Sequence, residues 1–389
     1  MMYKYEDIRV LHLEVTDKCN AACPMCARNI NGGEDNPQLP EVEITLENAV
    51  EMFPVEFISQ LDRMYMCGNY GDPIAARDTL EIFRYFRKNN ASMMLSLHTN
   101  GSAKSPEWWA ELARVLGRKG YVVFSIDGLK DTNHLYRQNT IFSKIMANAQ
   151  AFIDAGGRAR WDYIVFAHNE HQVEEAEALA NSMGFEKFQY KKSARFFSNA
   201  SGVTKEMHQS ANRKGLTTLL QPPENPKYRN SALKELSKIA STKNEVKFLP
   251  SKVSDLDTIL GRQTFNMDPD KKPPMEKYWD EAEIKCKVAE EKSLYISAEG
   301  VVQPCCWTAG QMYVWYWEPE SSQVWDFIRV VGKDNLNAKK TPLKDIVDGL
   351  FFQRLLPESW NKPSCAEGKL AVCAKTCGGK YDAFTEQFK

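Results

Sequence analysis

The sequence predicts an α/β fold in which parallel β/α units wind right-handedly into a barrel or part of a barrel. Two observations support this fold class. From about residue 7 to about residue 190, strand-like runs alternate with amphipathic helical runs, and four of the strands end in a polar or glycine-bearing motif. Because function gathers at the carboxyl ends of the strands in such folds, we expect one site on that face.

The predicted strands are short, mostly apolar runs bounded by turn residues. The first covers residues 7–15 and is apolar enough to be a buried strand. The other five cover residues 63–67, 92–99, 121–127, 160–167 and 185–190.

Amphipathic segments separate these strands along the chain. They predict helices over residues 78–90, 105–119, 141–156 and 171–184. A strand, a helix and a second strand form the unit from which parallel sheets are built, so this alternation predicts a parallel sheet.

The alternating rhythm ends near residue 190. Residues 191–285 contain QPPENP and DPDKKPP and few long apolar runs, so we interpret them as a linker or insertion with short helices. The chain is therefore expected to divide into a barrel at 1–190, this insertion, and a cysteine-bearing domain at 286–389.

Composition excludes several classes of protein. Lysine plus arginine (50) balances aspartate plus glutamate (51), so no whole-chain charge favours nucleic acid or a membrane surface. The amino terminus lacks the pattern of a signal peptide, and no apolar run approaches the roughly 20 residues of a membrane span. We therefore expect a cytoplasmic protein, whose ten cysteines serve metal binding, catalysis or packing rather than disulfides.

The cysteines gather at the two ends of the chain. Three lie within eight residues, at Cys19, Cys23 and Cys26, and Cys67 stands alone. The other six are Cys286, Cys305, Cys306, Cys365, Cys373 and Cys377. Two separate metal sites, one at each end, are the simplest physical explanation.

Four motifs accompany the first four predicted strands. CNAACPMC (19–26) follows the first strand, GNYGDP (68–73) the second and TNG (99–101) the third, and SIDG (125–128) closes the fourth. All four would lie at one face, where glycine turns let the backbone surround a bound small molecule. One such motif alone is usually a turn, but four aligned motifs favour an active site.

The CxxxCxxC spacing separates two kinds of metal site. Structural zinc takes four protein ligands, commonly in C-x2-C pairs, and fits this loop poorly. Three thiolates would leave one iron of a [4Fe–4S] cubane without a protein ligand and open to another molecule. With the motifs above, roughly residues 8–190 resemble the radical S-adenosylmethionine superfamily, in which this loop follows the first strand of a partial (β/α)6 TIM-type barrel.

The resemblance implies a chemistry as well as a fold. Cys19, Cys23 and Cys26 would hold the cluster, and S-adenosylmethionine would bind the open iron. A one-electron donor such as flavodoxin or ferredoxin would reduce the cluster. Cleavage of the cofactor would then give methionine and a 5′-deoxyadenosyl radical that abstracts hydrogen from the substrate.

The resemblance also assigns cofactor-binding residues. The GNYGDP loop would receive the ammonium group of the cofactor's methionine part. Ser125 and Arg137 would meet the carboxylate of that part, with Arg137 as a bidentate donor. Asn100 would lie near the ribose. Met25 stands where the family more often has an aromatic residue against the adenine, and a thioether still supplies a polarizable contact. The predicted cofactor-binding set is Met25, Gly68, Asn69, Gly71, Asp72, Asn100, Ser125 and Arg137.

The C-terminal cysteines resemble a second arrangement. Cys286, Gly300 and Cys305 form the pattern C-x13-G-x4-C, which is similar to the opening of the SPASM and twitch extensions that bind auxiliary [4Fe–4S] clusters. CAKTCG (373–378) supplies two further cysteines, spaced as the last pair of the SPASM pattern. The rest of that pattern is missing, so we expect one twitch-like auxiliary cluster beside a hairpin around AEG. Its predicted ligands are Cys286, Cys305, Cys373 and Cys377, with Cys365 as the substitute for Cys373. Zinc accepts the same ligands and stays an alternative.

Cys306 occupies a position of interest. The sulfatase-maturing branch has an aspartate there that serves as a base, so a thiol argues against formylglycine formation. The Cys306 thiol could donate a hydrogen atom to a substrate radical, as in radical epimerases, or it could be a small buried hydrophobe beside its neighbouring ligand.

The expected function is hydrogen abstraction from an unactivated carbon, followed by loss of an electron to the auxiliary cluster. Peptide or protein side chains are the first expected substrate class, small alcohols or sugars the second, and epimerisation with Cys306 as hydrogen donor the third reaction. A non-catalytic iron–sulfur or zinc protein is the alternative of a different kind. The intact GNYGDP motif, Ser125 and Arg137 argue against that alternative.

Overall fold

The computed structural model describes residues 2–30, 33–198, 203–204, 208–211, 217–240, 274–314, 318–380 and 386–387. Most of the DPDKKPP stretch of the predicted insertion lies outside these residues. Within them, no helix is long and apolar enough to cross a membrane.

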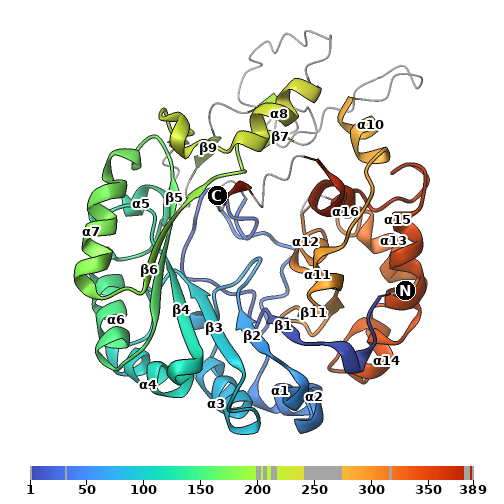
Figure 1. Ribbon diagram of the computed structural model, residues 1–389, viewed down its shortest axis with the longest axis horizontal. Coiled ribbons are helices and arrows are strands. Elements are labelled where there is room, and N and C mark those ends of the chain that lie inside the picture. The colour runs from blue at the N-terminus through green and yellow to red at the C-terminus, as the bar shows by residue number, and fades with distance from the viewer. Residues whose placement is uncertain are drawn as a thin grey trace.

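Six parallel strands form the centre of the fold and confirm the predicted α/β class. They lie side by side in chain order, and each neighbouring pair is parallel. Figure 1 shows them as a curved sheet running from blue to green. Their bounds are β1 (Val10–Leu13), β2 (Arg63–Met66), β3 (Met94–Thr99), β4 (Gly120–Ser125), β5 (Ala159–Val165) and β6 (Lys187–Lys192). This arrangement is typical of a partial TIM barrel.

Helices cover the outer face of the sheet (Figure 1). Four of them fall inside the predicted segments: α3 (Thr79–Asn89), α4 (Pro106–Leu116), α6 (Phe142–Asp154) and α7 (Val173–Met183). Two further helices that the sequence did not indicate, α1 (Leu46–Met52) and α2 (Val55–Gln60), lie between β1 and β2. The first connection of the sheet is therefore helical as well.

The sheet has an apolar outer face and a polar inner face. Along β5, Trp161 and Tyr163 are fully buried, whereas Arg160 and Asp162 are partly exposed. Successive side chains of a strand point to opposite faces, so the buried rings pack against the helices and the charged groups face the barrel interior. Burying each large aromatic side chain contributes about 1.5–3 kcal/mol.

The C-terminal part of the chain extends the same sheet. Strand β11 (Ser293–Ile296) pairs in parallel with β1, with Val10 opposite Ser293. Strand β12 (Val302–Gln303) pairs antiparallel with β11, so the hairpin predicted around AEG is present. Gly300 has a φ of +93°, and a Cβ there would lie 2.5 Å from Asn337 Oδ1, which explains the glycine in this turn. The divisions of the chain near residues 190 and 285 stay a prediction.

The remaining elements lie in the insertion, in the C-terminal part and in short turns. In Figure 1 the orange and red C-terminal helices gather beside β1 and β11. The insertion contains β7 (Phe197–Ser198), β8 (Val203–Thr204), β9 (His208–Ala211), β10 (Thr217–Leu220), α8 (Ser231–Ala240) and α10 (Pro274–Asp280). The C-terminal helices are α11 (Lys287–Glu290), α12 (Cys306–Ala309), α13 (Val324–Val331), α14 (Leu343–Val347), α15 (Leu356–Trp360) and α16 (Ala371–Cys373). The short turns are α5 (Asn133–Tyr136), η1 (Tyr5–Asp7), η2 (Pro73–Ala75), η3 (Gly117–Lys119), η4 (Glu170–Gln172), η5 (Pro226–Tyr228), η6 (Asp334–Leu336) and the π-helical η7 (Phe351–Leu355) and η8 (Ala374–Gly378).

Candidate functional site

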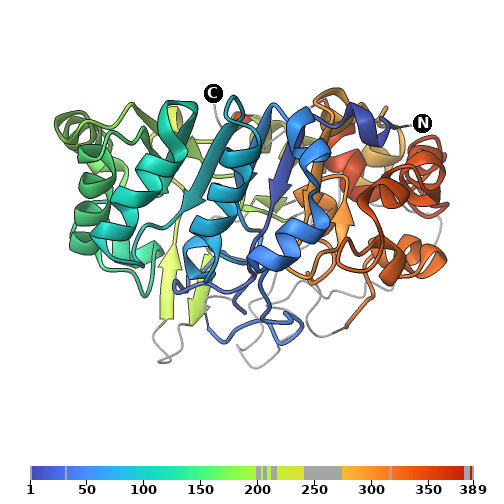
Figure 2. The same ribbon diagram turned by 90° about the horizontal axis from the view of Figure 1, so that it is seen from below.

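The three N-terminal cysteines lie in the loop that follows β1. Figure 2 shows this blue loop at the same edge of the molecule as the yellow-green segments that follow β6. Cys23 is buried and packs in an apolar cluster with Tyr136 and Phe166, while Cys19 and Cys26 are partly exposed at its margin. Burial raises the pKa of Cys23 to about 11, because an apolar environment disfavours the thiolate. All three thiols are free of disulfides.

Polar groups from other strand ends approach these sulfurs. Asn100 Nδ2, after β3, lies 3.8 Å from Cys19 Sγ. Arg137 Nη1, after β4, lies 3.9 Å from Cys23 Sγ, and its charge opposes the effect of burial on the pKa of that thiol. The loop after β1 and the ends of β3 and β4 therefore converge, as the strand-end rule predicts.

The arrangement of these cysteines fits one kind of metal site better than another. Within the described ranges, no three His, Cys, Asp or Glu side chains are grouped so that they could hold a single metal ion. A cubane binds each thiolate to a different iron, so its ligands need not converge on one point. Three free thiols with cationic and amide donors beside them fit a cluster better than a zinc ion.

Arg137 is held by a buried carboxylate that the sequence did not indicate. Its Nε lies 2.6 Å from Asp127 Oδ2, and the Asp127 side chain is completely buried. Burial raises the pKa of Asp127, although Arg137 opposes that effect. Asp127 accepts the hydrogen bond from the Arg137 Nε and thereby orients the guanidinium, so that Nη1 points toward Cys23. Ser125, at the end of β4, is partly exposed.

Asp72 joins the motifs after β2 and β3 into one unit. Its Oδ2 accepts hydrogen bonds from both the backbone N and the Nδ2 of Asn100, each at 2.7 Å. Its Oδ1 accepts from the backbone N of Ile74 at 3.2 Å. Burial raises the pKa of Asp72. The carboxylate predicted to face a cofactor ammonium thus also fixes the TNG turn.

The glycines of the GNYGDP loop are required by close approach of the backbone. A Cβ on Gly68 would lie 2.2 Å from the Gly71 carbonyl oxygen, and one on Gly71 would lie 1.8 Å from the Thr16 carbonyl oxygen. A side chain at Gly68 would therefore distort the loop itself, and one at Gly71 would push the loop away from the segment that follows β1.

Glu14, the residue after β1, is a site residue that sequence reasoning missed. It accepts hydrogen bonds from the backbone N of Tyr70 at 2.7 Å and of Gly71 at 3.1 Å, and from the Tyr295 hydroxyl. Burial raises its pKa to about 7. An acidic residue near the end of a mostly apolar predicted strand was the available signal.

The GNYGDP loop also contacts the C-terminal cysteine region. Asn69 Nδ2 donates to the Cys306 carbonyl oxygen at 2.7 Å, and the Tyr70 hydroxyl donates to the Gly310 carbonyl oxygen at 2.8 Å. The Asn69 amide predicted to bind a cofactor therefore faces α12. The Cys306 thiol is close enough to Cys67 and Glu14 for their charges to raise its pKa further, after burial as the main cause.

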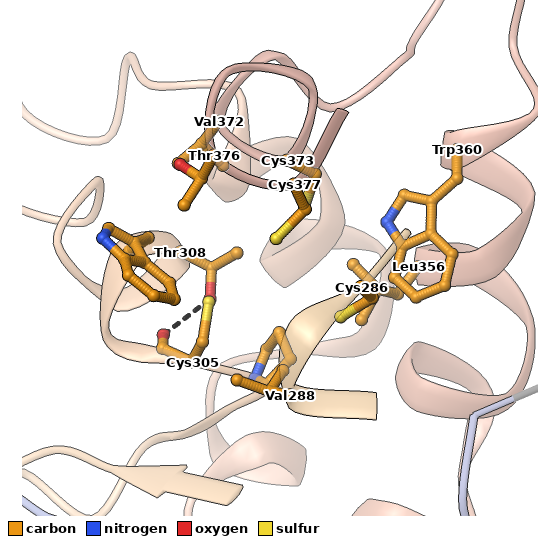
Figure 3. Close-up of a pocket in the computed structure, with 12 residues that line it drawn as sticks. Cys286, Val288, Cys305, Thr308, Leu356, Trp360, Val372, Cys373, Thr376 and Cys377 are labelled. Carbon is orange, nitrogen blue, oxygen red and sulfur yellow. Dashed lines mark hydrogen bonds between the residues drawn. The ribbon is translucent and has the colours of Figure 1, made fainter. Parts of the chain in front are cut away.

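A second site gathers four C-terminal cysteines around one pocket (Figure 3). The pocket is lined by Cys286, Cys305, Cys373 and Cys377, the four residues that the sequence predicted for the auxiliary site. Neither Cys365 nor Cys306 lines it. Instead, the Cys365 backbone N donates to Asp280 Oδ1 at 2.6 Å.

The thiols of this pocket interact with one another. A hydrogen bond with Cys377 is the main cause of the raised pKa of Cys286, and burial is the second. Cys305 and Cys377 raise the pKa of Cys373 further, after burial. Four thiolates this close are stable only with a compensating cation. Because no three such side chains of the described residues converge on a single ion, the four thiols fit a [4Fe–4S] cluster, whose ligands bind different irons, better than one zinc ion.

Polar side chains also line the barrel interior. The Lys191 Nζ and Asp162 Oδ2 atoms lie 2.5 Å apart, and both side chains are partly exposed. His12 Nε2 donates to the Cys67 carbonyl oxygen at 2.6 Å, and its ring stacks on Tyr65. These residues occupy the inward positions of their strands, a signal that alternation along each predicted strand could have provided.

The comparisons with known proteins agree with this architecture. The family model described as the Radical SAM superfamily matches residues 13–180. The structure of Streptococcus suis SuiB bound to the precursor peptide SuiA is similar at a TM-score of 0.51 and 13% identity, covering 95% of this chain and 72% of that chain. Histidine-tagged anSMEcpe with bound AdoMet is similar at a TM-score of 0.50 and 15% identity, covering 98% of this chain and 92% of that chain. At these identities the structures show a shared fold. The chain therefore contains, over residues 13–180, a domain of the radical SAM superfamily.

Proposed function

We propose that the protein is a radical S-adenosylmethionine enzyme that abstracts hydrogen from a substrate carbon and oxidises a peptide or protein side chain. The bound three-cysteine cluster and S-adenosylmethionine would supply the electron and the 5′-deoxyadenosyl radical for this chemistry. The observation that carries the proposal is the convergence of the free Cys19, Cys23 and Cys26 with polar groups from the ends of β2, β3 and β4.

The residues around these cysteines suit a charged, polar ligand. Arg137 brings a positive charge toward Cys23, and Asp127 fixes its orientation. The Arg137 Nη groups would meet a carboxylate, and Asp72, with Asn100 at its Oδ2, would accept from an ammonium. Met25 packs at the margin of the same apolar cluster as Cys23, where its thioether would contact an adenine ring.

The four-cysteine pocket supports the oxidative part of the proposal. Four thiolate ligands would complete the coordination of an auxiliary cluster and leave no iron open to substrate. Such a cluster accepts an electron rather than binding a ligand. The hydrogen bond from Asn69 to the Cys306 carbonyl oxygen links the two cysteine regions directly, which supports electron transfer from a substrate held between them.

A peptide substrate is the first choice because of a structural neighbour. SuiB, which shares the fold at a TM-score of 0.51, is described with a bound precursor peptide. The partly exposed Lys191–Asp162 pair in the barrel interior would offer a donor and an acceptor to such a chain. Small alcohols or sugars stay the second substrate class.

Epimerisation is a second candidate reaction, and the placement of Cys306 favours it. The thiol follows the pocket ligand Cys305 in sequence but does not line the pocket, and it is close enough to Cys305, Cys67 and Glu14 for their charges to act on it. A thiol there could return a hydrogen atom to a substrate radical. A Cys306→Ala variant that forms 5′-deoxyadenosine but no product would support this reaction, and unchanged product would exclude it.

The experiment that tests the proposal counts iron and sulfide after anaerobic reconstitution and measures 5′-deoxyadenosine formation with a chemical reductant. Wild type should bind about eight irons, and a variant with Cys19, Cys23 and Cys26 all replaced by Ala should bind about four, by the stoichiometry of two cubanes. The variant should form no 5′-deoxyadenosine. Cys67→Ala, which changes a thiol outside both cysteine sites, should match wild type and is the control.

Two outcomes would contradict the proposal. Turnover of S-adenosylmethionine by the triple variant would separate the chemistry from these cysteines. About four irons in wild type, all lost in the variant, would leave the C-terminal cysteines to zinc or to packing and would remove the electron route. Metal analysis of the same samples distinguishes zinc from an empty site.

A further inference from the structure

The four-cysteine pocket contains a buried hydrogen-bond donor without an acceptor. Trp360 lines the pocket, and its Nε1 atom is buried with no hydrogen-bond partner among the residues that the structure describes. Buried indole N–H groups usually find an acceptor. An unused donor beside four thiols therefore indicates that its partner belongs to whatever the thiols hold.

The indole is directed at the sulfurs. Figure 3 shows the Trp360 nitrogen on the edge of the ring that faces the pocket cysteines. Trp360 interacts with Cys373, but its N–H reaches hydrogen-bonding geometry with no acceptor among the described residues. Cys373 is therefore the pocket thiol beside which this donor stands unused.

The local backbone brings Trp360 to this position. It is the last residue of α15, which directly follows the π-helical turn η7. Cys377 lies in the second π-helical turn, η8, just after Cys373. π-helical turns occur frequently at functional sites, because they shift the face that a helix presents.

Another potential donor in the pocket is already engaged. Thr308 Oγ1 lies 3.6 Å from Cys305 Sγ but only 2.8 Å from the Cys305 carbonyl oxygen. A hydroxyl has a single hydrogen, and the closer carbonyl takes it. The Trp360 N–H has no such competing acceptor.

We propose that the Trp360 indole N–H donates a hydrogen bond to a sulfur of the auxiliary cluster site, either Cys373 Sγ or an adjacent sulfide, and raises the reduction potential of that cluster. The inference rests on the auxiliary cluster of the proposed function. Reduction adds one electron and no proton, so the reduced cluster is more negative and gains more from an N–H dipole than the oxidised one. Trp360 is thus a positioning residue that makes the auxiliary cluster a better electron acceptor.

The test is a redox titration followed by electron paramagnetic resonance on the reconstituted full-length protein. Trp360→Phe keeps an aromatic ring and removes the N–H. We expect a more negative midpoint potential for the auxiliary cluster, with the iron count and the potential of the three-cysteine cluster unchanged. Trp325→Phe is the matched control, because the buried Trp325 Nε1 donates at 2.9 Å to the Met312 carbonyl oxygen, outside the pocket.

The outcomes separate this inference from the function on which it rests. Eight irons in both proteins with identical midpoint potentials would overturn the role of Trp360 alone. An equal shift in Trp325→Phe would also overturn it, since the effect would then be general. About four irons in wild type would remove the auxiliary cluster and both proposals together.

A second measurement covers the case in which Trp360→Phe fails to take up the auxiliary cluster. Trp307 also lines the pocket, so the background is Trp307→Phe protein labelled with indole-15N tryptophan. Electron–nuclear double resonance on its reduced auxiliary cluster should show a 15N coupling. Absence of that coupling in a fully loaded protein would exclude the hydrogen bond.

Discussion

The two cysteine sites differ in both ligand number and surroundings. The N-terminal loop offers three thiols, with Asn100 and Arg137 directed at two of the sulfurs. The C-terminal pocket offers four thiols among mainly apolar side chains such as Val288, Leu356 and Val372. Charged and amide groups are costly to bury without a partner. Their presence at the first site and scarcity at the second indicate that a polar ligand belongs to the first alone.

The two sites are also assembled in different ways. The N-terminal site is built from successive strand ends, so its residues follow the order of the sheet. The C-terminal site joins residues more than 90 positions apart in sequence, from Cys286 to Cys377. They meet because α12 packs against α16 and the Lys285 backbone N donates to the Cys377 carbonyl oxygen at 3.0 Å. Strand β11 in turn docks on β1, and Glu14 and Asn69 bond across that junction.

The largest expected effect comes from breaking the buried ion pair that belongs to the N-terminal site alone. Asp127→Asn leaves Arg137 without its anion, although the amide oxygen can still accept from the Ile164 backbone N. Removing one partner of a buried pair costs about 3–5 kcal/mol. We expect that loss in the free energy of unfolding in anaerobic denaturant titrations, together with weaker S-adenosylmethionine binding by calorimetry.

An exposed ion pair gives the matched control. Arg354 and Glu358 lie 2.9 Å apart on the surface, and Glu358→Gln should cost at most about 1 kcal/mol. Equal losses in the two variants would show that Asp127 is not needed to hold Arg137. Iron content should stay at the wild-type value in both.

The second largest expected effect is a pH dependence of the free energy of unfolding that comes from Glu14, which joins β1 and the GNYGDP loop to Tyr295 of β11. The pKa of Glu14 is about 7 in the folded protein, against an ordinary value of 4.5, because of burial. The folded state therefore binds this proton more tightly, so its contribution to stability is complete below pH 4.5 and is lost as pH rises through 7. The shift corresponds to about 3 kcal/mol.

Glu14→Gln should remove this pH dependence. The free energy of unfolding of wild type minus that of the variant should fall between about pH 5 and 7.5. Taking this difference cancels the opposite contribution of His12, whose pKa burial lowers to about 3. Parallel pH profiles would contradict the prediction and would mean that Glu14 titrates near its ordinary value.

Sequence patterns predicted what depends on local periodicity and spacing. The six parallel strands, the four outer helices and the hairpin after Tyr295 follow from runs of residues that are contiguous in the chain. The quartet at the C-terminal pocket was predicted from the spacing of Cys286, Gly300 and Cys305 together with the CAKTCG pair, and the structure brings these four thiols together.

What the sequence could not predict depends on contacts between distant residues. Nothing local indicates that β11 pairs with β1, about 280 residues earlier. The roles of Asp127 and Glu14 are equally non-local, since each was one polar residue in a strand-like run, and its partner lies on another element. Nothing in the sequence distinguishes Trp360 from the other eight of the nine tryptophans, and only the structure shows that it lines the four-cysteine pocket.

The smallest expected effect is that of Cys365→Ala. Compared with Cys373→Ala, it distinguishes a cluster ligand from a neighbouring thiol in the C-terminal site. Cys365→Ala should leave the iron count at the wild-type value of about eight, whereas Cys373→Ala should lose about four irons, by the stoichiometry of a cubane. Cys365 does not line the pocket, and its backbone N, which the substitution keeps, makes the bond to Asp280. A loss of iron in Cys365→Ala with none in Cys373→Ala would mean that Cys365 is the ligand and Cys373 the neighbouring thiol. Cluster uptake would then require residues 361–370 to move toward the pocket, since Cys373 and not Cys365 faces its three partner thiols.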